Sequence, residues 1–377
     1  PMKLNPKAPD AIEVDFERKI EMTMPEGKIF ALESEATTVA SGVTPNPLTL
    51  RVNLGDCIKV NLKNKMKASR ASFFAPGLAF DPKDSQGLNV GNNGGDQTIG
   101  AGESRTYTYY AHPSNKETTS LVWDGGNIVL NPRNGLYGAI VVGPRGSQYR
   151  DPVTGADVSQ KNTWRADVIV DSSLTENAGK RNYRDVALFF QDEDNIIGTA
   201  FMPYVQNVAG LTSVNYRAEP YKFREEQGCS LGKIFQPCAV DKPEDPITPL
   251  IEAHAGDAIR IHVIGANSEQ NGMFGVEGHE WPIEPYMPGA DQISVVEYAG
   301  SETLDVFIRG GAGGPYRQVG DFVWSNARLP YTQSGQWGYL RVLPAGDSRI
   351  QPLGAAGMGA KQAEVEPAVK AIPTAMK

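Results

Sequence analysis

The stretch Gly55–Val60 reads GDCIKV, and a matching stretch, GDAIRI, stands 201 residues later at Gly256–Ile261. Two more pairs of markers repeat in the same order, with offsets of 200 and 198 residues; they are Gly135–Pro144 with Gly335–Pro344 and Ala101–Glu103 with Ala299–Ser301. The longer markers combine alternating apolar residues with glycines, which is the pattern of short strands separated by turns. Three ordered markers indicate one unit present twice. Because such a unit buries one sheet face on another, the sequence predicts an all-β chain of two tandem Greek-key β-sandwich domains.

Period-2 alternation predicts the strands of both domains. The expected strands are residues 11–24, 48–54, 58–62, 103–111, 135–142, 166–170, 186–190, 251–264, 292–298, 302–308, 321–324 and 336–342. In the first of them Ile12, Val14 and Phe16 fall on one face.

A loop-like stretch at residues 146–155 marks the domain boundary. It gives a first domain at 1–150 and a second at 151–344, with a long loop region between strands of the second half. Residues 345–377 lack periodicity, and we expect a low-complexity tail there that is flexible or laid as an arm on a neighbouring subunit.

Composition narrows the class of protein. The chain has 377 residues, 40% of them hydrophobic, which is enough for two soluble domains, and its 40 Gly and 27 Pro suit many short strands. A net charge of −8 without a basic stripe argues against nucleic acid as a partner. No apolar run approaches the length of about 18 residues expected of a transmembrane segment. The chain opens at Pro1 without a signal-like segment, which fits a mature, processed product and is compatible with export.

The three cysteines have two different expected roles. Cys229 and Cys238 stand in the loop CSLGKIFQPC and are either closed into a small disulfide or left as two unpaired loop thiols. Cys57 lies in an alternating strand, where we expect a buried free thiol.

Seven short motifs resemble landmarks of one family. They are GDCIKVNLKN at 55–64, FFAPGLAFD at 73–81, GLYG at 135–138, NYRAEP at 215–220, GHEW at 278–281, GDF at 320–322 and QWG at 336–338. As a set they resemble the tandem cupredoxin domains of multicopper oxidases, particularly the large bacterial manganese-oxidase type, over about Leu48 to Pro344. The resemblance implies a cupredoxin fold with copper as the family's cofactor. It also implies an oligomer, since two-domain relatives pack as trimers.

The family's copper ligands are missing from the matching positions in the second domain. Residues 272–281 read GMFGVEGHEW where the family has His-x-x-His-x-His-Gly-His. The ligand positions therefore fall on Gly272, Gly275 and Glu277, and only the non-ligand His279 remains.

The other ligand motifs are altered too. Phe74 and Pro76 stand where the family has His-x-His-Gly, and neither side chain can donate a lone pair to a metal. No cysteine follows Cys238, so the thiolate of a blue-copper centre is also lacking. The resemblance thus implies a frame without its copper centres, and we expect no cofactor and no catalytic residue.

The chain has four histidines, His112, His254, His262 and His279. We expect His262 on the solvent face of its strand, His254 and His112 at turns, and His279 holding a loop by hydrogen bonds. His254 and His279 stay weaker candidates for metal ligands. Glu277 is either a buried acid with a raised pKa, able to act as an acid or a ligand, or a residue in a salt bridge or on an exposed rim.

Three other segments carry polar or flexible character. Asp81, Asp84 and Asp96 flank a Gly/Asn-rich loop and are either oxygen ligands for calcium or parts of solvated turns. Residues 192–194 read Asp-Glu-Asp and are expected at a charged hairpin tip. Residues 310–314 are glycine-rich without a phosphate-binding pattern, which predicts a flexible loop.

The sequence leaves three functional hypotheses. The leading one is a multicopper-oxidase-like protein that has lost copper binding and serves as a structural or partner-binding subunit in a periplasmic or extracellular assembly, as a homo-oligomer such as a trimer or within a larger complex. The alternative is an enzyme, a metal-dependent oxidase linked to copper or manganese, with a rearranged site at His254, His279 and Glu277 or one completed by another subunit. The third is a matrix or surface-layer component stabilised by calcium.

Overall fold

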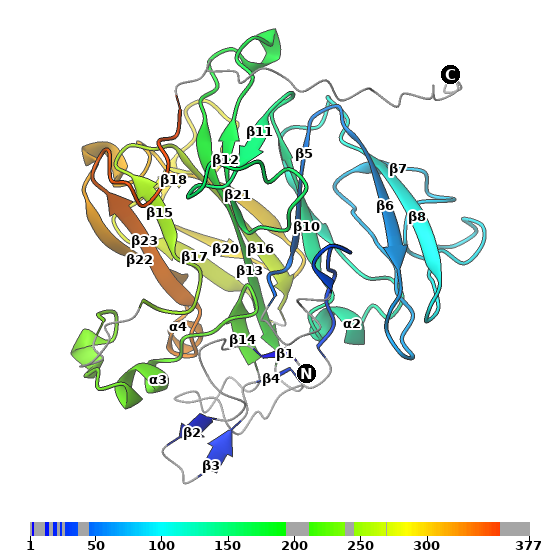
Figure 1. Cartoon of the computed structure of the whole chain (residues 1–377), viewed down its shortest axis with the longest axis horizontal. Helices are drawn as coiled ribbons and strands as arrows, with labels where there is room; N and C mark the ends of the chain where they lie inside the picture. The colour runs from blue at the N-terminus through cyan, green and yellow to red at the C-terminus, as the bar shows by residue number, and fades with distance from the viewer. Residues whose placement is uncertain are drawn as a thin grey trace.

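The computed structural model describes residues 27–36, 45–193, 211–237, 245–268 and 270–354, together with the backbone of four short N-terminal strands. It shows two β-rich domains side by side, the first built around β6, β7 and β8 and the second around β13 and β16 (Figure 1). No helix in these described segments is long and apolar enough to cross a membrane.

The first domain packs two small sheets around a core. One sheet has the order β5-β10-β9, formed by Leu48–Asn53, Gly138–Gly143 and Thr119–Val122. The other has the order β6-β8-β7, formed by Cys57–Lys63, Ser104–Tyr110 and Ala79–Phe80. The short helix α2 at Leu130–Arg133 leads into β10. Side chains such as Phe73, Tyr109 and Ile140 fill the space between the sheets.

The second domain has two larger sheets. The first has the order β11-β12-β13-β16-β21, formed by Gln148–Arg150, Arg165–Ile169, Tyr183–Glu193, Ile259–Asn267 and Thr303–Phe307, and β14 at Leu211–Val214 pairs with β13. The second has the order β15-β23-β22-β17-β20, formed by Ile251–His254, Trp337–Leu343, Gly320–Asn326, Gly272–Val276 and Val295–Tyr298. Further elements of this domain are β18 at Trp281–Pro282, β19 at Gln292–Ile293, α3 at Tyr221–Glu226 and α4 at Leu329–Gln333, together with short 3-10 turns.

The Gly-Asp marker makes the same turn in both domains. Gly55 and Gly256 have φ of 94° and 90°, a left-handed conformation that glycine adopts without steric cost. The following aspartate accepts a hydrogen bond from the backbone N–H three residues earlier, at 2.7 Å for Asp56 and 2.9 Å for Asp257. Each turn follows a strand that pairs in parallel with the last strand of its domain. In the first domain β5 pairs with β10, and in the second β15 pairs with β23. The predicted repeat of a β-sandwich is therefore confirmed.

The third marker matches with a register shifted by one residue. Glu103 Oε2 accepts from the N–H of Gly100 at 2.5 Å, and Glu302 Oε2 accepts from the N–H of Ala299 at 2.9 Å. These equivalent turns give an offset of 199 residues instead of 198. Ser301 consequently occupies the left-handed position, with φ of 76°, that Gly102 fills in the first domain with φ of 81°.

The two domains meet through the sheet β5-β10-β9 and the sheet that contains β13 and β16. A buried apolar cluster joins them; it comprises Leu121, Tyr137, Ala139, Ala187, Phe189, Tyr216, Ile264 and Ala266. Asn215 and Tyr216 both have positive φ, 51° and 62°, in a tight turn that pushes the Tyr216 ring to 5.2 Å from that of Tyr137. The Tyr216 hydroxyl donates to the carbonyl of Gly135 at 2.6 Å. The NYR motif therefore anchors one domain to the other.

Several local predictions are wrong. The predicted strand at 11–24 is divided into β2 at Ile12–Val14, β3 at Arg18–Ile20 and β4 at Thr23–Met24, and the first element is β1 at Met2–Lys3. Residues 148–150, expected in a loop, form β11. Cys57 is free but exposed, because its neighbours Ile58 and Val60 take the inner face of β6.

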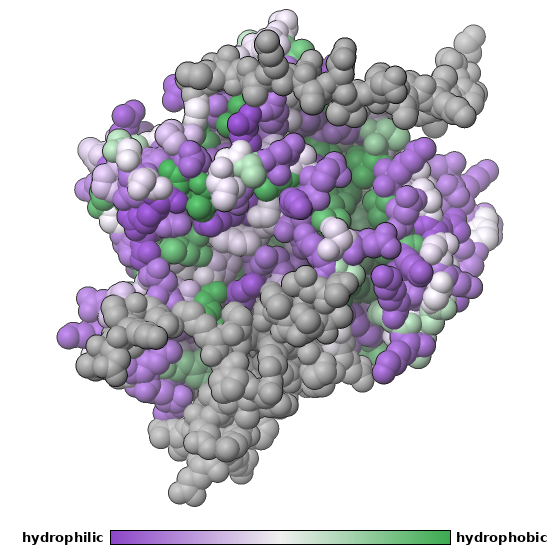
Figure 2. All heavy atoms as spheres, in the orientation of Figure 1, coloured by the Kyte–Doolittle hydropathy of each residue, from purple (hydrophilic) through white to green (hydrophobic). Residues whose placement is uncertain are grey.

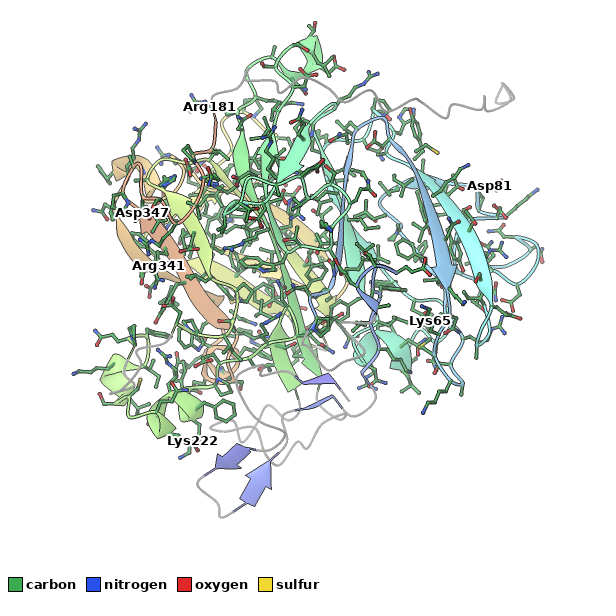
Figure 3. All side chains as sticks on the ribbon, in the orientation of Figure 1. Lys65, Asp81, Arg181, Lys222, Arg341 and Asp347 are labelled. Atoms are coloured by element: carbon green, nitrogen blue, oxygen red, sulfur yellow. The ribbon has the colours of Figure 1, made fainter. Side chains whose placement is uncertain are left out.

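The start of the expected tail is packed. Ile350 is buried, and the Arg184 guanidinium donates to the carbonyl of Gln351 at 2.7 Å. Asn182 donates to the carbonyl of Gly354 at 2.6 Å, and Asp347 lies beside the second domain (Figure 3). A flexible tail is thus the wrong description of residues 345–354, while residues 355–377 lie outside the described part of the chain.

Candidate functional site

Gly272 lies on β17 where the resemblance expects a copper ligand. Its neighbour across the sheet is Tyr298 on β20, and a Cβ at position 272 would stand 2.2 Å from the Tyr298 ring. Tyr298 is fully buried, and burial raises its pKa well above the usual value, so its hydroxyl stays neutral. That hydroxyl lies 3.1 Å from Nδ2 of Asn326, which also donates to Gln336 at 2.7 Å. An aromatic ring and an amide network therefore occupy the space that a ligand side chain would need.

At the next two positions where the resemblance expects copper ligands, Gly275 has no side chain and Glu277 faces solvent. A Cβ at buried Gly275 would approach Cγ2 of Val295 at 3.3 Å. Glu277 is exposed. Its N–H donates to the carbonyl of Val323 at 2.9 Å, and its Oε2 accepts from the N–H of Val323 at 3.3 Å. Glu277 therefore lies on an exposed rim and is not a buried acid.

His279 is buried and both of its ring nitrogens are engaged. Nδ1 lies 2.7 Å from the carbonyl oxygen of Glu277, so it carries the proton, and Nε2 accepts from the N–H of Gly313 at 3.0 Å. Burial lowers the pKa of His279, which keeps the ring neutral. The ring meets Phe322 edge-on at 4.8 Å. His279 therefore holds a loop and has no lone pair left for a metal.

The loop that His279 holds is the glycine-rich stretch at 310–314. Gly311 and Gly313 are buried with φ of 79°, and a Cβ on Gly313 would stand 2.4 Å from the carbonyl oxygen of Gln318. The prediction of a flexible loop is wrong, because these glycines allow the backbone to pack closely against its neighbours.

Phe74 and Pro76 lie at the positions of the first domain where the resemblance expects copper ligands. Phe74 exchanges two backbone hydrogen bonds with Trp123, at 3.0 and 2.9 Å, and its ring packs edge-on against Phe80 at 6.0 Å. Pro76 is exposed. This position is a packing site of aromatic residues.

His254 ends β15 and secures the segment after β23. Its Nε2 lies 2.8 Å from the carbonyl oxygen of Asp347, and its Nδ1 lies 3.7 Å from the carboxylate of Asp257. The imidazole therefore supports the segment at 345–354.

The three aspartates near the Gly/Asn-rich loop are exposed, and each has its own partners. Asp96 pairs with Arg70, and hydrogen bonds from Asn89 and Thr98 lower its pKa to about 2. Asp84 pairs with Arg105 at 3.4 Å, and Asp81 accepts from a nearby backbone N–H on the outer side of the first domain (Figure 3). Throughout the described segments, no group of three or more His, Cys, Asp or Glu side chains is arranged to hold a metal ion.

The cysteine pair and the acidic triplet are only partly described. Cys229 is disulfide-bonded, and Cys238 lies outside the described residues. Asp192 is buried and accepts a hydrogen bond from the Tyr331 hydroxyl at 2.8 Å, so it is not at an exposed hairpin tip. Asp194 lies outside the described residues.

His262 contradicts its prediction most clearly, because it is fully buried between the domains. Nε2 lies 2.7 Å from Asp185 Oδ2, and Nδ1 lies 2.6 Å from Asp305 Oδ1 and 2.7 Å from the hydroxyl of Thr119. Two carboxylates facing the two ring nitrogens require a protonated ring. Burial by itself would lower the pKa of His262, but the charges of Asp185 and Asp305 outweigh burial and raise it.

The ion pairs continue on both sides of His262. Arg51 of the first domain lies 2.8 Å from Asp185, whose pKa falls to about 2 because His262 and Arg51 outweigh the effect of its burial. Arg260 lies 2.7 Å from Asp305 and 3.1 Å from Glu117 of the first domain. Charges of alternating sign thus cross the contact between the domains. The alternation of apolar and polar residues along β16 correctly predicted that Arg260 and His262 lie on one face of the strand. It does not show that another domain covers this face.

Comparisons with known proteins support the architecture. No family model and no curated protein sequence matches the chain. A solved structure of the multicopper oxidase mgLAC is similar, with a TM-score of 0.51 and 16% identity over 80% of this chain and 78% of that chain. The chain has a two-domain cupredoxin fold. At this identity the likeness concerns the cupredoxin fold alone.

Two further solved structures resemble the same domains with TM-scores just below that of mgLAC. A blue copper oxidase from Nitrosomonas europaea has a TM-score of 0.49 and 14% identity, over 78% of this chain and 76% of that chain. A copper nitrite reductase from Nitrosomonas europaea has a TM-score of 0.49 and 15% identity, over 83% of this chain and 86% of that chain.

Proposed function

We propose that this chain is a multicopper-oxidase-like protein in which positions that hold copper ligands in the family have become packing positions, and that it serves as a structural or partner-binding subunit of a periplasmic or extracellular assembly. The observation that carries the proposal is the Tyr298 ring, which fills the space beside Gly272. Copper centres of the family need imidazole and thiolate donors. The side chains at these positions do not fit copper, and we derive no redox step from them.

An exposed apolar run supports a role in binding a partner. Ile128, Val129 and Leu130 are 65%, 55% and 47% exposed in succession. The side chain of Asn127 accepts hydrogen bonds from the N–H groups of Val129 and Leu130, at 3.3 and 3.0 Å, which holds the run in place. Consecutive exposed apolar residues are unusual on a free surface and are typical of contact sites. The partner is a second copy of the chain, as in the trimers that the resemblance implies, or another subunit.

Metal analysis tests the loss of copper binding. The full chain is expressed with copper, purified, and its metal content measured by mass spectrometry. We expect no stoichiometric copper or manganese. Stoichiometric copper that disappears in both His254→Gln and His279→Gln, accompanied by oxidation of a phenol or Mn(II), would overturn the proposal in favour of the oxidase.

Light scattering tests the partner. Molar mass is measured over a range of concentrations for the wild type, for Val129→Asp and for the matched control Val319→Asp, another exposed valine. We expect the wild type and the control to form a multimer and Val129→Asp to dissociate toward a single chain. A multimer that survives Val129→Asp contradicts this surface as the contact, and a monomer at every concentration removes a second copy as the partner.

A further inference from the structure

Lys28, just before the first domain, reaches a buried asparagine of α2. Its Nζ donates to Oδ1 of Asn131 at 2.7 Å, across 103 residues of sequence. The N–H of Lys28 also donates to the carbonyl of Asn134 at 2.8 Å, which holds its backbone beside the helix. Lys28 is half-buried, whereas Asn131 is fully buried. An amine and a carboxamide from distant parts of the chain are therefore kept in contact.

A buried carboxyl group lies on the other side of this carboxamide. Nδ2 of Asn131 donates to Oδ2 of Asp124 at 2.7 Å and to the carbonyl of Arg70 at 2.9 Å. Asp124 is fully buried, and burial raises its pKa by outweighing the hydrogen bonds that it accepts. Asp124 therefore holds a proton more readily than a carboxyl group on the surface does.

The turn after Asp124 keeps its carboxyl group in place. Oδ1 accepts from the N–H of Ser72 at 2.7 Å, and Oδ2 accepts from the N–H of Asn127 at 2.8 Å. A Cβ on Gly126 would stand 2.4 Å from the backbone of Arg70, so the turn can lie this close only with glycine there. The acid therefore has a fixed position beside the carboxamide.

The three groups have the arrangement that exchange of one amide for another requires. A hydrogen bond of 2.7 Å and a C=O bond of about 1.2 Å place Nζ of Lys28 at most about 3.9 Å from Cγ of Asn131. Reacting atoms in a productive arrangement lie about 3–3.5 Å apart, so a small movement of the lysine side chain is sufficient. Asp124 already contacts Nδ2, the nitrogen that would leave.

A second pair of lysine and asparagine lacks the acid. Nζ of Lys180 donates to Oδ1 of buried Asn177 at 3.2 Å, and it also pairs with Glu117 at 2.7 Å. Nδ2 of Asn177 donates to the backbone carbonyls of Arg145 and Asp171, at 2.8 and 2.9 Å, which uses both of its hydrogens. This pair is therefore an internal control in which we expect no reaction.

We propose that Lys28 and Asn131 form an isopeptide bond, with Asp124 as the residue that transfers the proton. Nζ in its neutral form attacks Cγ, the Cγ–Nδ2 bond breaks, and Nδ2 leaves as ammonia after taking the proton of Asp124. The proton that Nζ gives up restores the acid. One amide replaces another, so the step needs no oxidant and no further reagent. The inference goes beyond the proposed function and does not depend on whether the chain binds metal.

The bond would fasten the segment after Lys28 to the first domain. Phe30 in this segment packs edge-on against Phe73 at 5.4 Å, in the core between the two sheets. That core reaches the surface between the β5 and β6 sides of the domain, where Figure 2 shows hydrophobic atoms in a hollow. A covalent link at Lys28 holds the segment on the domain without relying on apolar contacts alone.

Mass spectrometry of the full chain, kept folded and then reduced and unfolded, tests the bond. We expect a mass below that of the sequence by one ammonia molecule. Lys28→Arg should keep the full mass, Asp124→Asn should slow the loss of ammonia about 100-fold or more, and the matched control Lys180→Arg should behave like the wild type. Trypsin should release a branched peptide in which residues 20–51 are joined to residues 117–133.

Two results would overturn the proposal. A wild-type chain that keeps the full mass of its sequence after long incubation, and gives no branched peptide, would mean that the contact is only a hydrogen bond. A loss of ammonia that persists in Lys28→Arg and maps to one unbranched peptide would mean succinimide formation at an Asn-Gly pair such as Asn134-Gly135. Lys28→Arg keeps the charge of a half-buried side chain, so it reports on the bond even if Asp124→Asn lowers the yield of folded protein.

Discussion

Replacing His262 by glutamine tests whether a buried imidazolium ties the two domains together. In the wild type its ring nitrogens lie 2.7 and 2.6 Å from the carboxylates of Asp185 and Asp305. A glutamine amide has one nitrogen and one oxygen, so it donates to one carboxylate at most and turns its oxygen toward the other. It also removes a positive charge from between two negative ones.

The size of the effect follows from burial. Removing one partner from a buried charge pair typically destabilises a protein by about 3–5 kcal/mol. Arg51 and Arg260 still neutralise Asp185 and Asp305 in the variant, so we expect the lower end, about 3 kcal/mol. This is a large share of the stability of an ordinary domain, about 5–15 kcal/mol.

The same residue predicts a pH dependence. The pKa of His262 is raised in the folded protein above its usual 6.5, because two carboxylates outweigh burial. Its contribution is therefore complete below pH 6.5 and is lost as pH rises through the folded-state pKa. Within that window the free energy of unfolding should fall by about 1.4 kcal/mol per pH unit from this one group. The variant lacks this slope, so the two proteins should differ most near pH 6 and less at higher pH.

Urea unfolding followed by tryptophan fluorescence measures both effects. The wild type and His262→Gln are compared at about pH 6 and about pH 8. His112→Gln is the matched control, since His112 is exposed and its ring hydrogen-bonds to Ser114, two residues along the chain. A loss under about 1 kcal/mol near pH 6, or a gap that stays constant with pH, would refute the reasoning.

Three further changes test the packing. Gly272→Ala should lower the free energy of unfolding by about 1–3 kcal/mol, because the added Cβ meets the Tyr298 ring. The loss should be smaller in a Tyr298→Ala background. Equal losses in both backgrounds would argue against the contact. Ser301→Gly should stabilise the chain by about 1 kcal/mol by relieving a left-handed residue, so an unchanged or lower thermal midpoint would contradict the assigned φ. Ile350→Ala should destabilise the folded chain by about 2–5 kcal/mol. Arg349 is an exposed neighbour, and Arg349→Ala should destabilise the chain by no more than about 0.5 kcal/mol. Similar losses for the two variants would mean that Ile350 is not buried.

Local chemistry made much of the fold predictable. The Gly-Asp turns at 55 and 256 need only a left-handed glycine and an aspartate that accepts from the backbone, so they are visible as a motif. Alternation of apolar residues likewise located β5, β6, β8 and β23 within a few residues, whereas the single strand expected at 251–264 is divided into β15 and β16 by the Gly-Asp turn. Because neighbouring residues on a strand face opposite sides of the sheet, Cys57 faces away from Ile58. The exposure of Cys57 could therefore have been predicted from the sequence, and the prediction of a buried thiol misread this alternation.

The sequence by itself determined the repeated β-sandwich and the absence of metal-donor atoms from the side chains of Gly272, Gly275, Phe74 and Pro76, because both depend on residue identity and short-range periodicity. Only the tertiary structure decided what covers each face. It placed His262 in a salt-bridge network by laying the first domain over β16, and it filled the space beside Gly272 with a ring that is adjacent only through sheet pairing. Contacts of this kind join residues far apart in the chain, and no local pattern specifies them.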